Sequence, residues 1–290
     1  MDTITHTLMG LTVYGSVNKE NIAQPTKKAI FVAAIVGNQI PDIDILFNLV
    51  EKGRIMYQMW HRGVSHSLLM APFWALIIYA ICYLIWKDKD KRIFYIALIS
   101  VFLHIGFDAL NTWGTGLFEP FSSTRVTLGM ISIVDVVIWL FMLMGFAFIK
   151  FKKTYPEYKI WRIVWMIIFV HVIVQCVQGQ IISMDADLAY EKSVISASFV
   201  PGNFSVIGKN EDVVEIYIKT VWGAKKNIQI LHSKEKADLT PLFAENPKAE
   251  VLIQWSPFVV IVEEENRLGI FDPRFYRNGS SFLAEYIEKK

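Results

Sequence analysis

Cysteine is scarce in this chain, and so is charge of either sign. Its 290 residues include two cysteines, Cys82 and Cys176, which lie in apolar runs without the CxxC spacing of a thiolate metal site. This usage is typical of small buried hydrophobes and excludes a disulfide framework. Lys, Arg, Asp and Glu make up only 19% of the residues, and the basic ones form no continuous stripe, so we expect no nucleic-acid partner. The first residues also lack the basic region and cleavage site of a signal peptide.

Apolar residues, by contrast, are abundant at 53% of the chain. They form five segments that are each long enough for a helix to cross a hydrocarbon core of about 30 Å. These segments are 29–50, 68–86, 93–111, 128–149 and 160–182. A weaker apolar stretch at 3–17 adds a sixth crossing if it enters the membrane. The pattern predicts a polytopic α-helical membrane protein with five to six membrane helices.

The pattern changes from about residue 190. Runs at 213–218, 228–231 and 251–255 alternate or are β-branched, and Gly, Asn and Pro bound them. We expect a further hairpin from 258–263 and 267–271, and a terminal helix over 281–290. The sequence therefore predicts two domains. Residues 1–185 form the helical membrane domain, and residues 186–290 form a β-rich extramembrane domain.

The basic residues between apolar segments predict the orientation. The connecting stretches 19–28, 87–92 and 150–159 carry eleven Lys and Arg residues, whereas 51–67 and 112–127 carry four. Cytoplasmic loops are enriched in Lys and Arg, so the first group is expected inside and the second outside. The last apolar segment then delivers residues 186–290 to the extracytoplasmic side.

The most informative residues are polar ones placed in or beside apolar segments, where a carboxylate costs about 2.5–3.5 kcal/mol. They form four clusters: His6; Asp42 and Asp44; His61, Arg62 and His66; His104 and Asp108. The predicted topology puts the last three clusters at the outer membrane interface, although the charge rule used none of the Asp or His residues. His6 joins them only if the apolar stretch 3–17 crosses the membrane. A shared site at one interface is the simplest interpretation.

Spacing indicates what two of these clusters can do. His104 and Asp108 are four residues apart, so both side chains project from one face of a helix. They suit two ligands of one metal, or an Asp that orients the His. Asp42 and Asp44 follow Pro41, which frees the backbone from helical pairing and lets both carboxylates turn toward one point. The alternative for these two is a helix N-cap.

The loop from His61 to Ser67 is the most specific element. Two imidazoles, His61 and His66, flank a small turn that contains Arg62. Neutral imidazole is a good ligand for zinc and other first-row metals, and the guanidinium matches phosphate or carboxylate oxygens. Ser65 or Ser67 is expected to cap the next helix. An incidental polar connection is the competing interpretation.

Four motifs in this order, ITHTLMG, GNQIPDID, HRGVSHSLL and HIGFD, carry a family resemblance. Over about residues 1–150 the chain resembles the YdjM/YfhP-like family of bacterial membrane-bound metal-dependent hydrolases. That resemblance implies a multi-pass protein of the bacterial plasma (inner) membrane. It also implies a metal site drawn from His6, Asp44, His66, His104 and Asp108.

The leading hypothesis is a hydrolase at the outer leaflet, with zinc, manganese or a two-metal pair at those five residues. The metal would acidify a bound water. Asp42 or His61 would act as general base or as a partner of a ligand, and Arg62, or less directly Arg125, would hold a developing anion. A site at the interface favours a membrane lipid or lipid-linked substrate, such as a phosphate ester. The rival hypotheses are a noncatalytic metal-stapled scaffold and a metal ion transporter, whose polar residues should run through the full bilayer depth.

Overall fold

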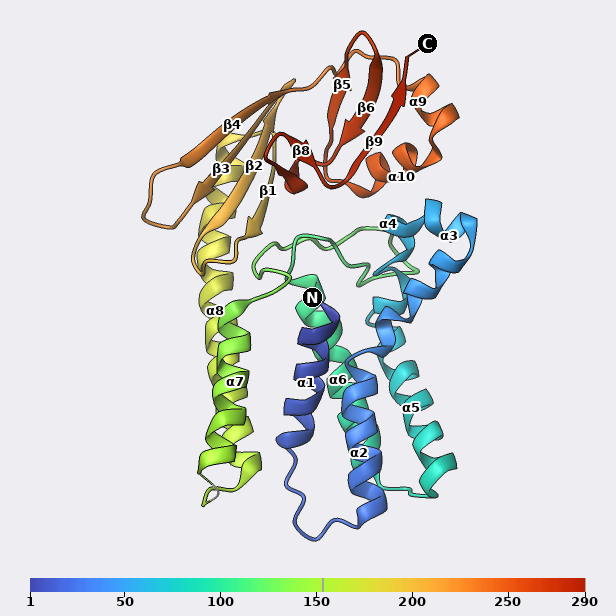
Figure 1. Ribbon diagram of the computed structural model, residues 1–290, viewed down its shortest axis with the longest axis vertical. Coiled ribbons are helices and arrows are strands. Elements are labelled where there is room, and N and C mark those ends of the chain that lie inside the picture. Colours follow the sequence, from blue (N-terminus) through green and yellow to red (C-terminus); the bar gives the residue numbers. More distant parts are fainter. Residues whose placement is uncertain (153, 290) are drawn as a thin grey trace. The chain divides into compact units, whose positions relative to one another are not determined.

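The computed structural model describes residues 1–152 and 154–289 of the chain (Figure 1). They divide into two compact units. The first comprises Met1–Asp44 and Arg62–Gln175, and the second comprises Ile45–His61 and Cys176–Lys290. Lys153, one of the basic residues counted for the topology, lies outside the described residues.

The first unit is built from helices joined by short connections. Its elements are α1 (Thr3–Gly15), α2 (Gln24–Gly37), the 3-10 turn η2 (Val64–His66), α5 (Met70–Trp86), α6 (Lys91–Ala109), α7 (Val136–Phe151) and the first part of α8 (Glu157–Ala189). A 3-10 segment, η1 (Ile40–Leu49), begins in this unit. Pro41 has no backbone N–H for a helical bond, so α2 ends at Gly37 and the chain turns before η1.

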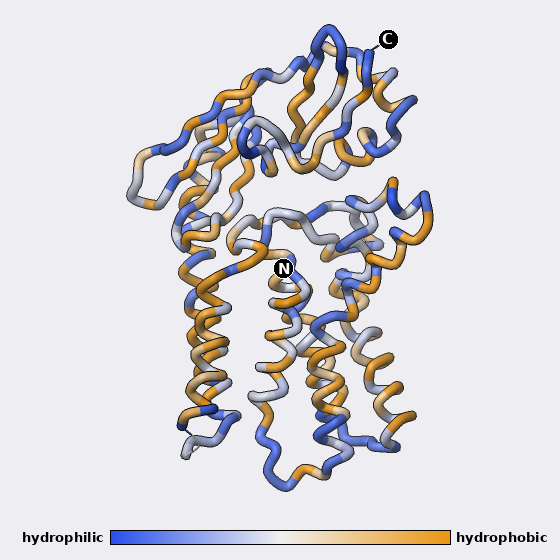
Figure 2. The backbone as a smooth tube through the Cα atoms, in the orientation of Figure 1, coloured by the Kyte–Doolittle hydropathy of each residue, from blue (hydrophilic) through white to orange (hydrophobic). Residues whose placement is uncertain are grey.

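Among the described residues, two helices, α6 and α8, are long and apolar enough to cross a membrane. The pair α2 with η1, and the pair 57–66 with α5, raise the number to four if each bent pair counts as one span. Helix α7 is apolar but shorter. The tube coloured by hydropathy shows these helices as mostly hydrophobic, with hydrophilic residues in the loops that join them (Figure 2). A helical region with two to four candidate membrane spans is therefore confirmed, whereas the expected count of five to six crossings is not.

Small residues let three helices of the first unit approach closely. Ala29, Ala33 and Ala97 are fully buried in the cluster where α2, α5 and α6 meet. A Cβ added at Gly37 would lie 2.7 Å from the Cβ of Ser100 and 2.9 Å from the carbonyl oxygen of Ala97. Glycine at this position thus keeps the end of α2 against α6, one turn before His104.

We expect Gly37→Ala to destabilise the protein by about 1–3 kcal/mol, because the added methyl group would force α2 away from α6. Gly106→Ala is the matched control, since a Cβ at that helical position meets nothing within 4 Å. Alanine also favours helix over glycine by up to about 1 kcal/mol. Thermal unfolding can be followed by the reactivity of the buried Cys82 thiol. Equal unfolding midpoints for the two variants would contradict the close approach.

The two ends of the first unit differ in chemistry. The loops that join α1 to α2, α5 to α6 and α7 to α8 lie at one end (Figure 1), and they contain the Lys-rich stretches of the sequence. The other end holds the start of α1, the turn after α2, η2 and the end of α6. Each of these four places carries one of the His and Asp clusters identified in the sequence.

The second unit contains most of the β structure. Four antiparallel strands pair in chain order: β1 (Lys192–Ala197), β2 (Phe204–Asn210), β3 (Val213–Lys219) and β4 (Lys226–His232). A second sheet has the order β5 (Val260–Glu263), β6 (Arg267–Phe271) and β9 (Ala284–Glu288), and β7 (Tyr276–Arg277) pairs with β8 (Ser280–Ser281). The helices are α3 (Glu51–Ile55), α4 (Tyr57–Trp60), α9 (Thr240–Glu245) and α10 (Pro247–Trp255), with the 3-10 turn η3 (Pro273–Phe275). The β-rich C-terminal part expected from the sequence is confirmed.

Two local predictions in this unit are wrong. Residues 251–255 belong to α10 rather than to a strand: Pro247 begins this helix, and the Asn246 side chain accepts a hydrogen bond from Lys248 N. The buried residues Val251, Leu252 and Trp255 have the spacing of one helical face. The expected terminal helix over 281–290 is instead occupied by β9, which pairs with β6.

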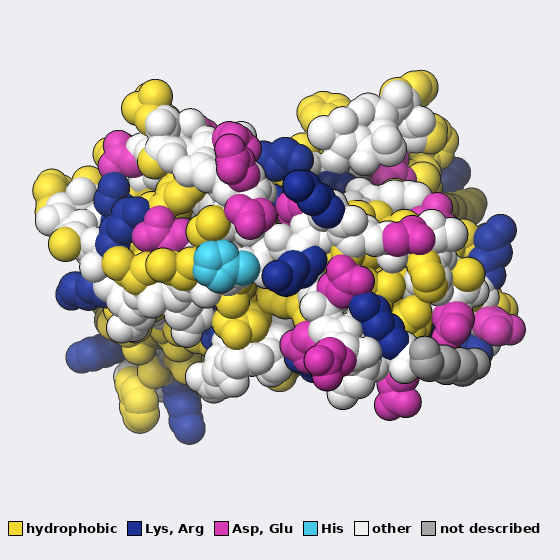
Figure 3. Space-filling view, turned by 90° about the horizontal axis from the view of Figure 1, so that it is seen from above, with side chains coloured by type: hydrophobic (Ala, Val, Ile, Leu, Met, Phe, Trp, Pro, Cys, Tyr) yellow, Lys and Arg dark blue, Asp and Glu magenta, His cyan; other side chains and the backbone are white. Residues whose placement is uncertain are grey.

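The space-filling view from above shows acidic, basic and apolar side chains interspersed (Figure 3). On this described face, basic residues are not gathered into one stripe. A continuous basic stripe is the usual electrostatic footprint of a nucleic-acid-binding surface.

Candidate metal centre

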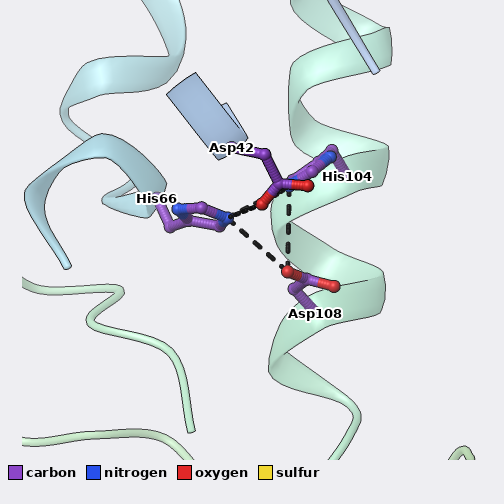
Figure 4. A group of neighbouring side chains, drawn as sticks. All are labelled: Asp42, His66, His104 and Asp108. Carbon is purple, nitrogen blue, oxygen red and sulfur yellow. Dashed lines mark hydrogen bonds and ion pairs between the residues drawn. The ribbon is translucent and has the colours of Figure 1, made fainter. Parts of the chain in front are cut away.

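Four donor side chains of the first unit converge at one point (Figure 4). Asp42 comes from the first turn of η1 and His66 from η2, while His104 and Asp108 lie one turn apart on α6. One ligand atom from each of these residues lies within 4.8 Å of all the others. We call these four residues the donor cluster.

The spacing of these atoms suits a small cation. The Nε2 atoms of His66 and His104 are 3.1 Å apart. Asp42 Oδ1 lies 3.3 Å from the first and 3.6 Å from the second, and Asp108 Oδ2 lies 3.5 and 3.7 Å from them. Four ligands in tetrahedral geometry about 2.0–2.1 Å from zinc would be separated by about 3.3 Å. The donor cluster thus has nearly the dimensions of a tetrahedral site.

The end of α2 fixes the orientation of His104. Its Nδ1 lies 2.8 Å from the carbonyl oxygen of Asn38, the residue that caps α2. Carbonyl groups at a helix end lack partners within the helix, and they can only accept hydrogen bonds. Nδ1 therefore carries the proton, and Nε2 of the neutral ring presents a lone pair to the donor cluster.

Ser65 and Asp44 orient the His66 ring so that its Nε2, like that of His104, faces the donor cluster. The Ser65 hydroxyl donates to Asp44 Oδ2 at 2.7 Å, so its oxygen accepts from His66 Nδ1 at 2.9 Å. Asp44 Oδ2 itself lies 3.3 Å from His66 Nδ1. The proton again sits on Nδ1, and the Nε2 lone pair again faces the donor cluster. This is the arrangement in which metal-binding histidines are held by carboxylates and carbonyls.

The two imidazoles therefore oppose lone pair to lone pair. His66, His104 and Asp108 are fully buried, so water does not reach these atoms from bulk solvent. With the proton of each ring on Nδ1, the two Nε2 atoms are acceptors 3.1 Å apart, and two acceptors cannot hydrogen-bond to each other. A cation between them removes the conflict, and the two carboxylates neutralise its charge. The residues present thus fit a divalent metal with nitrogen and oxygen ligands.

Asp108 is held by three further groups, the first of which is the buried Met1 ammonium beside its Oδ1. Its Oδ1 lies 3.3 Å from His6 Nε2, and the His6 ring stacks on that of His104 with a centroid distance of 3.8 Å. On the other side, Arg62 Nε lies 3.0 Å from Asp108 Oδ2. His6 is fully buried beside the donor cluster but contributes no atom to it, and its Nδ1 has no hydrogen-bond partner among the described residues.

Arg62 does not project toward solvent. It is 6% exposed, its Nη1 donates to Asn111 Oδ1 at 2.9 Å, and its backbone N–H donates to Asp44 Oδ2 at 2.9 Å. Its φ of 58° lies in the left-handed region, which non-glycine residues seldom adopt. These contacts hold it there, with its Nε beside Asp108 Oδ2.

The other predicted residues make contacts of their own. His61 ends α4 in the second unit and stacks on Tyr57, with a centroid distance of 5.1 Å. Arg125 lies 3.6 Å from Glu119, and both side chains are largely buried. Burial raises the pKa of the Glu119 carboxyl group against the opposing effect of Arg125. In the first unit, Asp135 caps α7.

Sequence reasoning missed two residues that support the site. The backbone carbonyl of Asn38 orients His104, and the side chain of Asn111 holds Arg62. An asparagine directly after the apolar part of a helix was the available signal for Asn38. Ser67 fulfils the expected capping role by accepting from Met70 N, which leaves Ser65 for Asp44.

Comparisons with known proteins support a membrane location for this chain. The profile of the YdjM inner membrane protein family matches residues 1–182, which include the whole donor cluster. The chain is 35% identical over 151 residues to the uncharacterized protein YfhP of Bacillus subtilis (strain 168). That alignment covers 51% of this chain and 46% of YfhP, so the chain spans about half the length of this relative. No solved structure matches the chain.

Proposed function

Because this chain belongs to the YdjM inner membrane protein family, we propose that it is a membrane-embedded metal-dependent hydrolase. The metal would be held by the donor cluster of Asp42, His66, His104 and Asp108. The observation that carries the proposal is the pair of opposed Nε2 atoms 3.1 Å apart, each with its Nδ1 hydrogen-bonded to an acceptor on the far side.

The donor set favours zinc. Two imidazoles and two carboxylates are borderline to hard ligands, which zinc accepts in tetrahedral sites, and manganese is the main competitor. A divalent ion held by these donors would supply a nucleophile near neutral pH by lowering the pKa of a bound water, which requires a coordination position beyond the four of a closed tetrahedral site. A second metal would need donors beyond the four, and Asp44 and His6 are the other two residues that the sequence assigned to the metal.

The chain's own residues divide into donors and supports. Asn38 orients His104, and Ser65 with Asp44 orients His66. Asp42 differs from the other donors, because its side chain is 24% exposed whereas those of the other three are fully buried. Substrate would therefore approach from the side of Asp42. From these contacts we assign Asp42 to the metal and Asp44 to the support of His66. We assign Arg62 and His6 to the support of Asp108. A base role for His61 stays a prediction.

The site's place in the bundle suggests its substrate. The donor cluster lies at the end of the first unit opposite the Lys-rich loops, which the positive-inside rule assigns to the cytoplasm. We therefore propose an outer-leaflet interface for the site and an extracytoplasmic side for residues 186–290. A lipid-linked phosphate ester would bring its polar bond to that interface. The donors gather at one end, whereas an ion path needs polar groups through the whole bilayer depth, which argues against transport.

The function can be tested by turnover in reconstituted vesicles. The zinc- or manganese-loaded protein is expected to release product from one of a panel of phosphorylated lipids. Asp42→Asn should reduce that turnover at least about a hundredfold, since it removes a negative ligand at the open side of the cluster. Asp185→Asn is the matched control, because this exposed residue on α8 pairs with Lys219 far along the chain from the donors.

A noncatalytic metal staple is the second candidate. The four donors come from η1, η2 and α6, so an ion would join three separate segments, and its binding energy would stabilise the fold. Metal-loaded protein that resists unfolding but turns over none of the phosphorylated lipids would favour the staple over the enzyme.

A further inference from the structure

An open groove of about 830 Å³ runs between α1, α6 and α8 in the first unit. Its walls are apolar, with Ile99 and Leu103 on α6 and Phe169 and Ile173 on α8. Its lining also includes two arginines, Arg92 and Arg162. The donor cluster contributes no residue to this lining, so a ligand bound in the groove is independent of the proposed function.

The arginines mark one end of the groove. Arg92 lies in the first turn of α6 and Arg162 in the second turn of α8, and both helices begin at the end of the unit that holds the Lys-rich loops (Figure 1). The lining extends from Arg92 to Leu103 and from Arg162 to Ile173, which is a rise of about 16 Å along each helix at about 1.5 Å per residue. One leaflet of a hydrocarbon core of about 30 Å has nearly this thickness.

Both guanidinium groups retain donors for an anion. Arg162 Nε donates to the carbonyl oxygen of Ser16 at 3.1 Å, and its guanidinium lies 5.0 Å from the centre of the Tyr158 ring. Within the described residues, its two terminal nitrogens make no hydrogen bond. Asp90 holds Arg92 through Nε and Nη2, which leaves Nη1 as the donor that Arg92 can offer. The Arg92 side chain is 52% exposed.

We infer that this groove binds an anionic phospholipid of the leaflet on the Lys-rich side. The phosphate would lie between Arg92 and Arg162, and an acyl chain would follow the apolar walls toward Leu103 and Ile173. Basic pockets between membrane helices on the cytoplasmic side are the places where anionic headgroups bind. Arginine suits the role because its planar fork matches phosphate oxygens.

The test is lipid titration of the purified full-length protein, monitored by native mass spectrometry. Phosphatidylglycerol and phosphatidylcholine with identical acyl chains are the probes. Each arginine is expected to contribute about fivefold in affinity, so the wild type should prefer phosphatidylglycerol by about 25-fold. The double variant Arg92→Gln, Arg162→Gln should lose that preference.

Two further variants separate charge from shape. Lys28→Gln with Lys91→Gln removes the same charge from exposed positions at the same end but outside the groove, and it should keep the preference. Met166→Trp narrows the groove and should weaken both lipids equally. The inference is overturned if the wild type binds the two lipids alike, or if Arg92→Gln, Arg162→Gln keeps the preference. A dimer that covers the groove and excludes lipid would also overturn it.

Discussion

Replacing Arg62 with methionine is expected to lower the free energy of unfolding of the metal-free protein by about 1.5–3 kcal/mol. Asp108 is completely buried, and Arg62 Nε lies 3.0 Å from its Oδ2. The methionine would remove that guanidinium, one of the two cations beside this carboxylate, and leave the Met1 ammonium as the other in a region of low dielectric constant. It would also leave the Asn111 amide oxygen without the hydrogen bond from Nη1.

A double variant distinguishes the charge effect from simple loss of packing. Arg62→Met with Asp108→Asn removes both members of the pair and should recover only part of the lost stability in chelator-treated protein, because the buried Met1 ammonium then loses its own partner. Arg62→Lys should fall between the wild type and Arg62→Met, since it keeps the charge but not the fork that reaches Asn111. Reactivity of the buried Cys82 thiol reports unfolding. Wild-type stability of Arg62→Met, or no recovery in the double variant, would contradict the role assigned to Arg62.

Divalent metal adds a further expected result. An ion at the donor cluster supplies positive charge beside Asp108, so metal should reduce the difference between Arg62→Met and the wild type. Ligands that bind only the folded state stabilise it by mass action.

The sequence predicted much of the donor cluster, because the signals were local. The i, i+4 spacing of His104 and Asp108 needs only a helix to put both on one face, and α6 is that helix. The break at Pro41 also lies where the sequence indicates it, after the end of α2. The four motifs that carried the family resemblance all fall within residues 1–182, and the membership is confirmed.

The division of labour between Asp42 and Asp44 was not predictable in this way. The two carboxylates are separated by one residue on η1, and distant partners decide which of them faces the donors. The backbone N–H of Arg62 and the hydroxyl of Ser65 hold Asp44, which leaves Asp42 beside the two Nε2 atoms. Such contacts join segments about twenty residues apart, and no periodicity in the sequence encodes them.

Arg62 illustrates the same limit. Its residue type suggested an anion-binding group, and the structure gives it a buried anion within the protein, Asp108. In the second unit, residues 251–255 are of types that favour strands, yet they lie in a helix. Pro247 and the Asn246 cap begin this helix, which buries Leu252 and Trp255. Tertiary burial outweighs intrinsic preference there.

Removing both imidazoles of the donor cluster is the second change with a large expected effect. His66→Ala with His104→Ala leaves two carboxylates, which bind zinc poorly without nitrogen partners. Four-ligand zinc sites supply about 10–16 kcal/mol, so losing two ligands should weaken binding at least about a thousandfold. His232→Ala is the control, because His232 is an exposed histidine on β4.

The most direct test of the central claim is the metal content of the purified protein, measured by elemental analysis. The wild type and His232→Ala are expected to retain a divalent metal in stoichiometric amount, and His66→Ala with His104→Ala is expected to retain almost none. Equal metal content in all three proteins would show that the donor cluster is not the metal site.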